Sequence, residues 1–273
     1  MGARAPDNGT GTSQDGMASR ADRDTRGGGA HWQAWLAEFA ATAVLLFVMA
    51  TLFRWLAGPG SPLAEAVPSQ GGRLVVDAVV SGATVGLLIL SPLGRRSGAH
   101  MNTAVSVAFW LMGALPGRDL APYAVAQLAG SVTGVAAGRL LWGGALAGPG
   151  PDFAAVRAAQ GVPVPLVFLS EAVATALLLA AVTHVAARPG PAPRVPLVAG
   201  AAVTVLILLT GGWAGGSFNP ARQFGPGLLA GDTGWLWVYA PAPLIAAVLF
   251  AAVRSALPGA PPPPRMEFGQ APR

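Results

Sequence analysis

Six long apolar segments dominate this sequence and constrain its fold more than any other feature. They cover residues 32–56, 74–93, 120–142, 164–187, 195–213 and 235–257, and proline or glycine stands near their borders. A helix needs about 20 mostly apolar residues to cross the hydrocarbon core of a bilayer. Only 11% of the residues are charged, whereas a soluble domain carries about a quarter. We therefore predict an all-α membrane protein with six transmembrane helices, whose main solvent is the lipid bilayer.

Two shorter apolar segments, residues 102–112 and 219–229, lie between the long ones. As a helix, each would measure roughly 16 Å at about 1.5 Å per residue. That length reaches about halfway across a hydrocarbon core of ~30 Å. The sequence therefore predicts two half-length helices inside the membrane domain, which is an unusual feature.

Composition excludes several other classes of protein. The chain contains no cysteine, so disulfides, thiolate metal sites and cysteine nucleophiles are ruled out. The histidines His31, His100 and His184 lie far apart, without the spacing of metal ligands. The net charge of +5 comes from arginines that punctuate the apolar runs and form no basic stripe with interleaved aromatics. We expect no metal, no cofactor, no nucleic-acid partner and no enzymatic activity.

The two ends of the chain differ from the membrane domain, which covers residues 32–257. Residues 1–31 are rich in Gly, Asp, Arg and Ser and lack the apolar core of a signal peptide, so we expect a disordered tail. Residues 258–273 contain four consecutive prolines and are expected to form a flexible, Pro-rich tail. Six spans place both termini on one side, together with twelve of the 17 arginines. Because cytoplasmic loops carry an excess of arginine, both termini are expected to be cytoplasmic.

The sequence repeats one pattern in two halves. These halves cover approximately residues 32–142 and 164–257. The first and fourth spans share a stretch that begins at Glu38 and Glu171 and continues with Ala, Thr, Ala, Leu and Leu at equivalent positions. Each short segment then opens with Gly-x-x-x-Asn, ending at Asn102 and Asn219. An odd number of spans in each half inverts the second copy, and inverted repeats with broken helices place a solute site near the bilayer midplane.

The residues around these asparagines resemble the paired Asn-Pro-Ala loops of the aquaporins, the major intrinsic protein family. The loops read Ser-Gly-Ala-His-Met-Asn-Thr-Ala-Val at residues 97–105 and Gly-Ser-Phe-Asn-Pro-Ala-Arg at residues 216–222. The resemblance covers roughly residues 35–254. It implies an aquaporin-like fold and a passive channel for water or small uncharged solutes that excludes protons and ions. It also implies a homotetramer, with one pore in each subunit, in the plasma membrane.

The physical properties of the two motifs agree with such a pore. The motifs consist of Asn102, Thr103, Ala104 and of Asn219, Pro220, Ala221. Asparagine suits a helix N-cap, and proline suits the first helical position, where no N–H is needed. Each half-helix would present the positive end of its dipole at the membrane centre, which repels cations and hydrated protons. Thr103 stands where the family usually has proline. Threonine adds a hydroxyl and lacks the fixed φ of proline.

The resemblance also assigns roles to single residues. The selectivity filter, the narrowest part of the pore, falls at Gly82 (Ser81 if one residue is deleted), Ile207, Gly216 and Arg222. Arg222 is expected to donate hydrogen bonds to solute oxygens and to repel cations. Loop support is expected from Glu38, Glu171, His100 and Gln127. The two glutamates would accept hydrogen bonds from non-helical loop backbone that lipid cannot satisfy.

The substrate stays open between water and small neutral solutes. Small residues at two filter positions and an aliphatic residue at a third predict a wide, weakly polar opening that admits glycerol-sized molecules. Gln223 points the other way, because glycerol facilitators carry aspartate there, and the loops that are long in those proteins are short here. The expectation is water plus a small polyol, urea or a hydroxylated metalloid.

Two alternatives to a channel remain. A secondary transporter also uses inverted repeats and broken helices, but it needs a coupling carboxylate, and the midspan candidates are the two loop-bracing glutamates. A non-conducting membrane scaffold is the other alternative, to which Thr103 gives slight support. Asp77 lies within a turn of the start of the second span and is expected to be interfacial.

Overall fold

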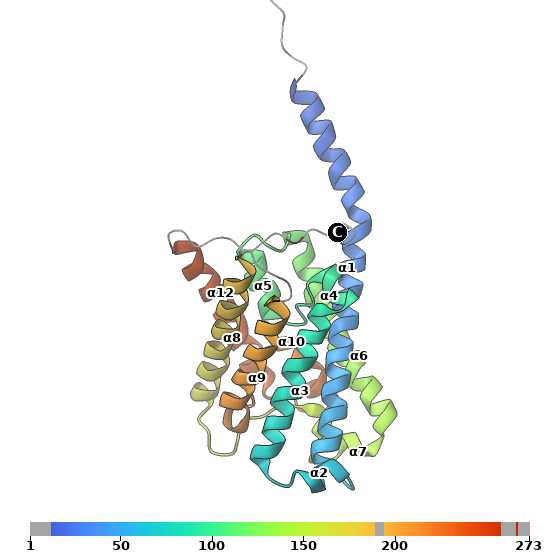
Figure 1. Ribbon diagram of the computed structural model, residues 1–273, viewed down its shortest axis with the longest axis vertical. Helices are drawn as coiled ribbons and strands as arrows, with labels where there is room; N and C mark the ends of the chain where they lie inside the picture. The colour runs from blue at the N-terminus through green and yellow to red at the C-terminus, as the bar shows by residue number, and fades with distance from the viewer. Residues whose placement is uncertain (1–11, 189–193, 258–265, 267–273) are drawn as a thin grey trace, which may run out of the picture.

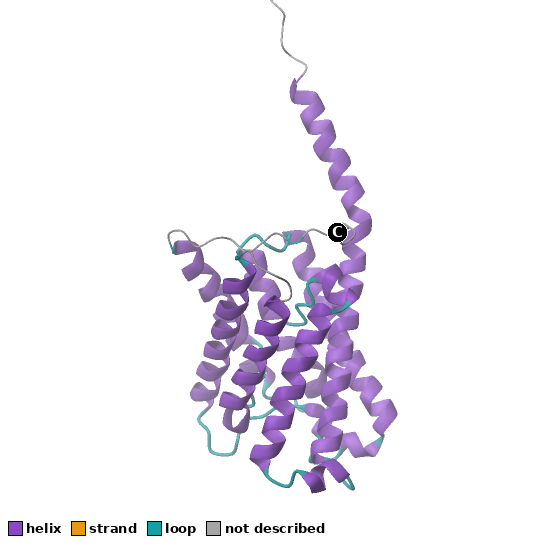
Figure 2. Ribbon diagram, viewed as in Figure 1, coloured by secondary structure: helices purple, strands orange, loops and turns teal. Residues whose placement is uncertain are grey.

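The computed structural model describes residues 12–188, 194–257 and 266, with side chains from residue 31 onward. Helices joined by loops make up this described part, which contains no strand (Figure 1, Figure 2). The helices long and apolar enough to span a membrane are α1 (Thr12–Ala57), α3 (Gln70–Leu90), α6 (Gly117–Trp142), α8 (Val164–Ala186), α9 (Arg194–Ala214), and α11 (Leu236–Tyr239) continued by α12 (Pro241–Ala256). The half-length helices are α5 (Thr103–Leu111) and α10 (Pro220–Leu229). The remaining short helices are α2 (Pro62–Ala66), α4 (Pro92–Ser97), α7 (Gly144–Ala147) and η1 (Asp152–Ala154).

The predicted spans agree with these helices to within a few residues, and the structure adds two details at their ends. α1 continues back to Thr12 through much of the predicted disordered tail, because extending a helix adds hydrogen bonds without a new nucleus. The sixth span is interrupted at Ala240, since Pro241 lacks the N–H that a continuous helix needs. The predicted Pro-rich tail lies outside the described residues, except for Met266.

Glycines allow the long helices of one chain to approach closely. α1 packs along α6, where a Cβ atom added at Gly134 would lie 2.2 Å from the carbonyl oxygen of Ala43. α3 packs along α9, where a Cβ atom added at Gly200 would lie 2.7 Å from the carbonyl oxygen of Gly82. These small residues therefore serve helix contacts inside the subunit.

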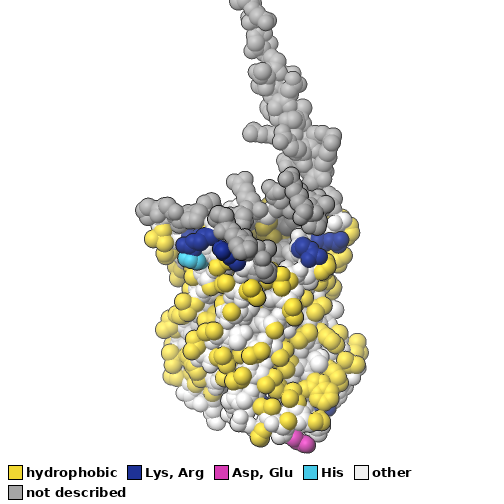
Figure 3. All heavy atoms as spheres, in the orientation of Figure 1, with side chains coloured by type: hydrophobic (Ala, Val, Ile, Leu, Met, Phe, Trp, Pro, Cys, Tyr) yellow, Lys and Arg dark blue, Asp and Glu magenta, His cyan; other side chains and the backbone are white. Residues whose placement is uncertain are grey.

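The outer surface of the helix bundle is apolar around its middle (Figure 3). Large hydrophobic side chains such as Leu87, Val125 and Leu140 are 66%, 67% and 87% exposed. Dark blue arginine side chains gather at the end of the molecule at which α1 begins (Figure 1, Figure 3). Soluble monomers rarely expose an apolar surface of this extent, so this belt is the surface that faces lipid.

Candidate functional site

An asparagine begins each half-helix. Oδ1 of Asn102 accepts a hydrogen bond from the backbone N–H of Ala104 at 3.0 Å. Oδ1 of Asn219 accepts one from the backbone N–H of Ala221, also at 3.0 Å. Both asparagines have an extended backbone, with φ of −150° and −155°, which is the usual geometry of an N-cap. The positive ends of both helix dipoles therefore lie at these two residues.

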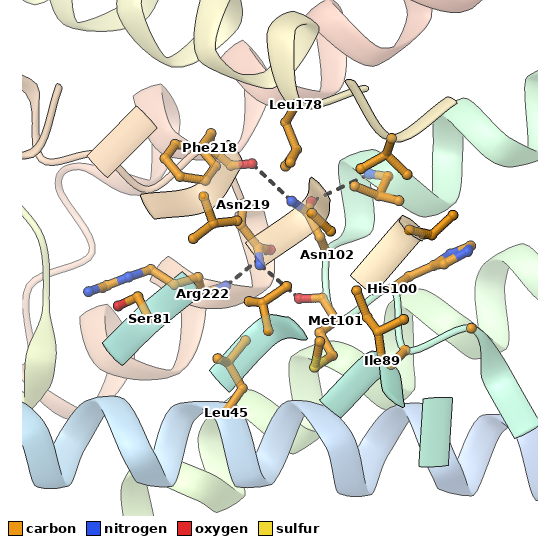
Figure 4. A pocket seen from close by; sticks show the side chains of 18 of the residues that line it. Leu45, Ser81, Ile89, His100, Met101, Asn102, Leu178, Phe218, Asn219 and Arg222 are labelled. Atoms are coloured by element: carbon orange, nitrogen blue, oxygen red, sulfur yellow. Dashed lines mark hydrogen bonds between the residues drawn. The ribbon is translucent and has the colours of Figure 1, made fainter. Parts of the chain in front are cut away.

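The two asparagines also join the two loops to one another (Figure 4). Nδ2 of Asn102 donates to the carbonyl oxygen of Phe218 at 3.0 Å. Nδ2 of Asn219 donates to the carbonyl oxygen of Met101 at 2.7 Å. A side-chain amide nitrogen carries two hydrogens, so one N–H of each asparagine is left over from these bonds. The N-termini of α5 and α10 thus meet inside the helix bundle.

Thr103 stands where Pro220 stands in the other half-helix. Both occupy the first helical position, at which no backbone N–H is required. Threonine therefore permits the helix start, and the two half-helices begin alike. The difference is chemical, because Oγ1 of Thr103 is buried without a hydrogen-bond partner among the described residues.

A buried glutamate holds the loop before α5. Oε1 of Glu38 accepts from the backbone N–H of His100 at 2.7 Å, and Oε2 accepts from that of Met101 at 2.9 Å. Nε2 of Gln127 donates to the same carboxylate at 2.8 Å. Ala99 and Met101 have φ values of 43° and 47°, so this segment cannot satisfy its own N–H groups as a helix does. The carboxylate supplies the acceptors that lipid lacks.

His100 adds side-chain contacts to this support. Its Nδ1 atom lies 3.0 Å from Oγ of Ser106, which also accepts a hydrogen bond from Gln127 at 2.9 Å. The imidazole ring packs against Phe109 and Tyr123, with centroid distances of 4.9 Å and 5.6 Å. His100 therefore links the first loop to both α5 and α6.

Glu171 repeats the arrangement in the second half. Its Oε1 accepts from the backbone N–H of Ser217 at 2.9 Å, and its Oε2 accepts from the backbone N–H of Phe218. The residue is only 1% exposed. The neighbouring glycine, Gly216, has a φ of +64°. Residues with a Cβ atom rarely adopt this backbone conformation. Each half of the chain thus uses one glutamate to hold one loop.

A cavity of about 350 Å³ lies beside the paired asparagines. Figure 4 shows Ser81 and Arg222 on one side of the asparagine pair and Ile89 and His100 on the other. Ile207 and Gly216 line the same cavity. Most of the remaining lining consists of aliphatic side chains, so polar contacts for a solute are concentrated at Arg222, Ser81 and the two loops.

The two alternatives for one expected filter position, Gly82 and Ser81, face different parts of the structure. Gly82 faces α9, because a Cβ atom added there would lie 2.1 Å from Oγ1 of Thr204. Ser81, the alternative that assumes one deleted residue, lines the cavity and is 5% exposed. Successive residues of a helix point about 100° apart, so a shift of one residue moves a side chain from the cavity to a helix contact.

Arg222 and Gln223 hold the loop of residues 148–163 against the end of the cavity at which Ser81 and Arg222 lie. Nη1 of Arg222 donates to the carbonyl oxygen of Ala154 at 2.6 Å. The side-chain amide of Gln223 donates to the carbonyl oxygen of Val156 at 2.9 Å and accepts from its N–H at 3.2 Å. Sequence reasoning missed Ala154 and Val156, since they act through their backbone and carry no side-chain signal.

Asp77 was expected to be interfacial, and the structure links it to the cavity lining. Its Oδ1 accepts a hydrogen bond from Oγ of Ser81 at 2.9 Å. Its carboxylate also interacts electrostatically with Arg222. The available signal was the spacing of four residues between Asp77 and Ser81, which puts both on one face of a helix.

Met266 lies at the end of the cavity opposite Arg222. The sequence did not predict it as a cavity residue. Its backbone N–H donates to the carbonyl oxygen of Ala114 at 2.9 Å. Its side chain packs with the cluster that contains Phe109 and Tyr123, and it contributes to the cavity lining. A Cβ atom added at Gly98 would lie 2.7 Å from the terminal methyl of Met266. Nothing in the surrounding proline-rich sequence indicates this contact.

Known proteins are similar to this chain in sequence and in fold. The family model described as major intrinsic protein matches residues 28–253. Aquaporin-8 of Rattus norvegicus is 34% identical over 223 residues, which cover 79% of this chain and 81% of that protein. Aquaporin NIP1-3 of Oryza sativa subsp. japonica is 34% identical over 212 residues, which cover 76% and 71%.

A solved structure gives the same result for the fold. The X-ray structure of the aquaglyceroporin from Plasmodium falciparum aligns with a TM-score of 0.68 at 22% identity, over 83% of this chain and 96% of that chain. The chain belongs to the major intrinsic protein family, and it is a membrane channel for water and small solutes.

Proposed function

We propose that the channel is passive, and that it admits small uncharged solutes (glycerol, urea or hydroxylated metalloids) beside water while it excludes ions and protons. The observation that carries this proposal is the set of residues at one end of the cavity: Ser81, Ile207, Gly216 and Arg222. Ser81 is small and Gly216 contributes no side chain, which favours an opening wide enough for more than water. Pore diameter and the hydrogen-bonding groups of the lining set the selectivity of such a pathway.

Exclusion of cations and protons is supported by the meeting point of the half-helices. Two helix N-termini, each equivalent to about half an elementary positive charge, lie at Asn102 and Asn219. The remaining N–H of each asparagine can donate to a passing water oxygen. A water that accepts both of these hydrogen bonds cannot accept another, so a chain of proton-hopping waters is broken there. The guanidinium of Arg222 adds a full positive charge to the proposed permeation pathway.

The contacts of the two buried glutamates disfavour a secondary transporter. A transporter needs a carboxylate that binds and releases a coupling ion on the pathway. Glu38 and Glu171 instead use their oxygens for backbone N–H groups of the pore loops. We propose that they are structural supports.

We also propose that the protein has no enzymatic activity. The resemblance to the aquaporins further implies that it functions as a homotetramer.

We further propose that the protein is a multi-pass protein of the plasma membrane with both termini in the cytoplasm. The end of the bundle at which α1 begins carries the gathered arginines (Figure 3). Arginines are enriched on the cytoplasmic side of membrane proteins. A cysteine added near the N-terminus and labelled with an impermeant reagent in intact cells tests this orientation, and no labelling without permeabilisation is expected.

Stopped-flow light scattering on proteoliposomes tests the channel function. The panel compares water, glycerol, urea and boric acid, with empty liposomes as the control. We expect fast, non-saturating fluxes with low activation energy that persist when proton and sodium gradients are collapsed. Flux that saturates with solute concentration, or that disappears with a collapsed gradient, would favour the transporter. Permeability equal to that of empty liposomes for every solute would favour the non-conducting scaffold.

A further inference from the structure

An acidic residue stands directly behind the proposed filter. Asp77 precedes Ser81 by one helical turn on α3, and the Ser81 hydroxyl donates to its carboxylate at 2.9 Å. Ser81 lines the cavity, on the same side of the asparagine pair as Arg222 (Figure 4). None of the roles described above uses the carboxylate of Asp77.

The geometry restricts what the Ser81 hydroxyl can offer to a solute. A hydroxyl has one hydrogen and two lone pairs. Its oxygen lies 2.9 Å from the Asp77 carboxylate and 3.1 Å from the sulfur of Met49. A carboxylate is a far stronger acceptor than a thioether, so the hydrogen is directed to Asp77. Ser81 then presents its lone pairs to the cavity and acts as an acceptor.

Arg222 supplies the complementary group. Its guanidinium has five N–H donors and no acceptor, and one of its nitrogens is engaged by the carbonyl oxygen of Ala154. The Asp77 carboxylate attracts the guanidinium electrostatically. The filter therefore has donors at Arg222 and an acceptor at Ser81, and Asp77 holds the Ser81 hydroxyl by a hydrogen bond.

We propose that Asp77 is a positioning residue for solute selectivity: it orients the Ser81 hydroxyl as an acceptor beside the Arg222 donors. The solutes favoured by this arrangement are small neutral molecules that carry both hydrogen-bond donors and acceptors, such as polyols and urea-like amides. Such a solute loses part of its hydration shell at the filter, and the two groups replace one acceptor and one donor of that shell. This inference rests on the proposed permeation of small solutes.

The test measures the ratio of urea permeability to water permeability in proteoliposomes that contain the full chain. Asp77→Ala releases the Ser81 hydroxyl, and Ser81→Ala removes it. Each variant is expected to lower the ratio about fivefold, the factor that corresponds to one neutral hydrogen bond, while water permeability changes less than the ratio. The double variant is expected to match Ser81→Ala alone, because residues that act through one another are not additive.

Two further variants keep the test decisive. Val79→Ala changes a side chain on the same helix that is 51% exposed, and it is expected to leave the ratio unchanged. Asp77→Asn is nearly isosteric and retains a weaker acceptor, so it is the substitute if Asp77→Ala does not fold, with a smaller decrease expected. An unchanged ratio in both Asp77 variants, or additive losses in the double variant, would overturn the positioning role alone. Absence of urea flux in the wild-type protein would overturn the proposed solute permeation and this inference together.

Discussion

Asn102 and Asn219 are joined crosswise: each donates its side-chain amide to the backbone of the other's loop, at 3.0 Å and 2.7 Å. The same side chains cap their own half-helices through Oδ1. One pair of residues thus sets the position of two helix ends and two loops.

Replacing Glu171 by glutamine should destabilise the second loop. Both carboxylate oxygens accept backbone N–H groups, from Ser217 and Phe218. Glutamine has only one acceptor oxygen, so one buried N–H would face an amide NH₂, at a cost of about 1–3 kcal/mol. Thermal unfolding in detergent should shift to lower temperature, with lower water permeability in proteoliposomes. The exposed Glu65→Gln is the control and should leave both unchanged; equal behaviour of the two variants would argue against the bracing role.

Thr103→Pro should stabilise the first half-helix. It removes a buried hydroxyl that has no partner among the described residues, and proline at the first helical position lowers the entropy of the unfolded chain. The gain should be about 1 kcal/mol, visible as a higher unfolding temperature. Pro220→Thr is the reciprocal variant and should be less stable than the wild type. A loss of stability in Thr103→Pro would show that the hydroxyl makes a contact of its own.

A cysteine scan with a mercurial should establish which face of α3 lines the pore. The wild-type chain has no cysteine, so mercury should not inhibit it. Ser81→Cys places a thiol in the cavity lining and should make water permeability sensitive to the mercurial, with recovery after addition of a reducing thiol. Val79→Cys, on the exposed side of the helix, should stay insensitive. Inhibition of the wild type, or equal sensitivity of the two variants, would contradict the placement of Ser81.

Gly134→Ala should disrupt the packing of α1 on α6. The new Cβ atom would meet the carbonyl oxygen of Ala43 at 2.2 Å, so the backbones would have to separate. Overpacking of this kind typically costs about 1–3 kcal/mol. Gly71→Ala is the matched control, because no atom lies within 4 Å of its added Cβ, and it should be neutral or slightly stabilising. Thermal unfolding of both variants in one detergent measures the difference, and equal stability would refute the close helix contact.

Met266→Ala should widen the end of the cavity that lies opposite Arg222. The methionine side chain packs with the cluster around Phe109 and lines the cavity. Shortening it removes atoms from the lining, so water permeability per channel should rise, while the lost packing against Phe109 should lower the unfolding temperature. Stopped-flow measurements at matched protein density compare it with Leu257→Ala, an exposed residue after α12. Equal or lower permeability in Met266→Ala would show that this side chain does not narrow the route.

The sequence by itself determined the features that depend on neighbouring residues. The length of the apolar segments predicted the spans, because a helix forms all the hydrogen bonds of its own backbone and so can cross lipid. Asn219 followed by Pro220 predicted a helix start, since a cap and a first-turn proline act within a few residues. The repeated Glu and Gly-x-x-x-Asn pattern predicted two inverted halves. The family resemblance then identified Arg222 as a pore residue.

Only the tertiary structure decided the features that depend on distant residues or on rotation about a helix axis. The choice between Ser81 and Gly82 is a shift of about 100°, which depends on how α3 packs against α9. The partner of Arg222 is a backbone carbonyl 68 residues away, and backbone groups leave no trace in residue identity. The contacts of Met266 and the electrostatic interaction of Asp77 with Arg222 also depend on residues far away in the sequence. These positions are set by the packing of whole helices, which no local pattern records.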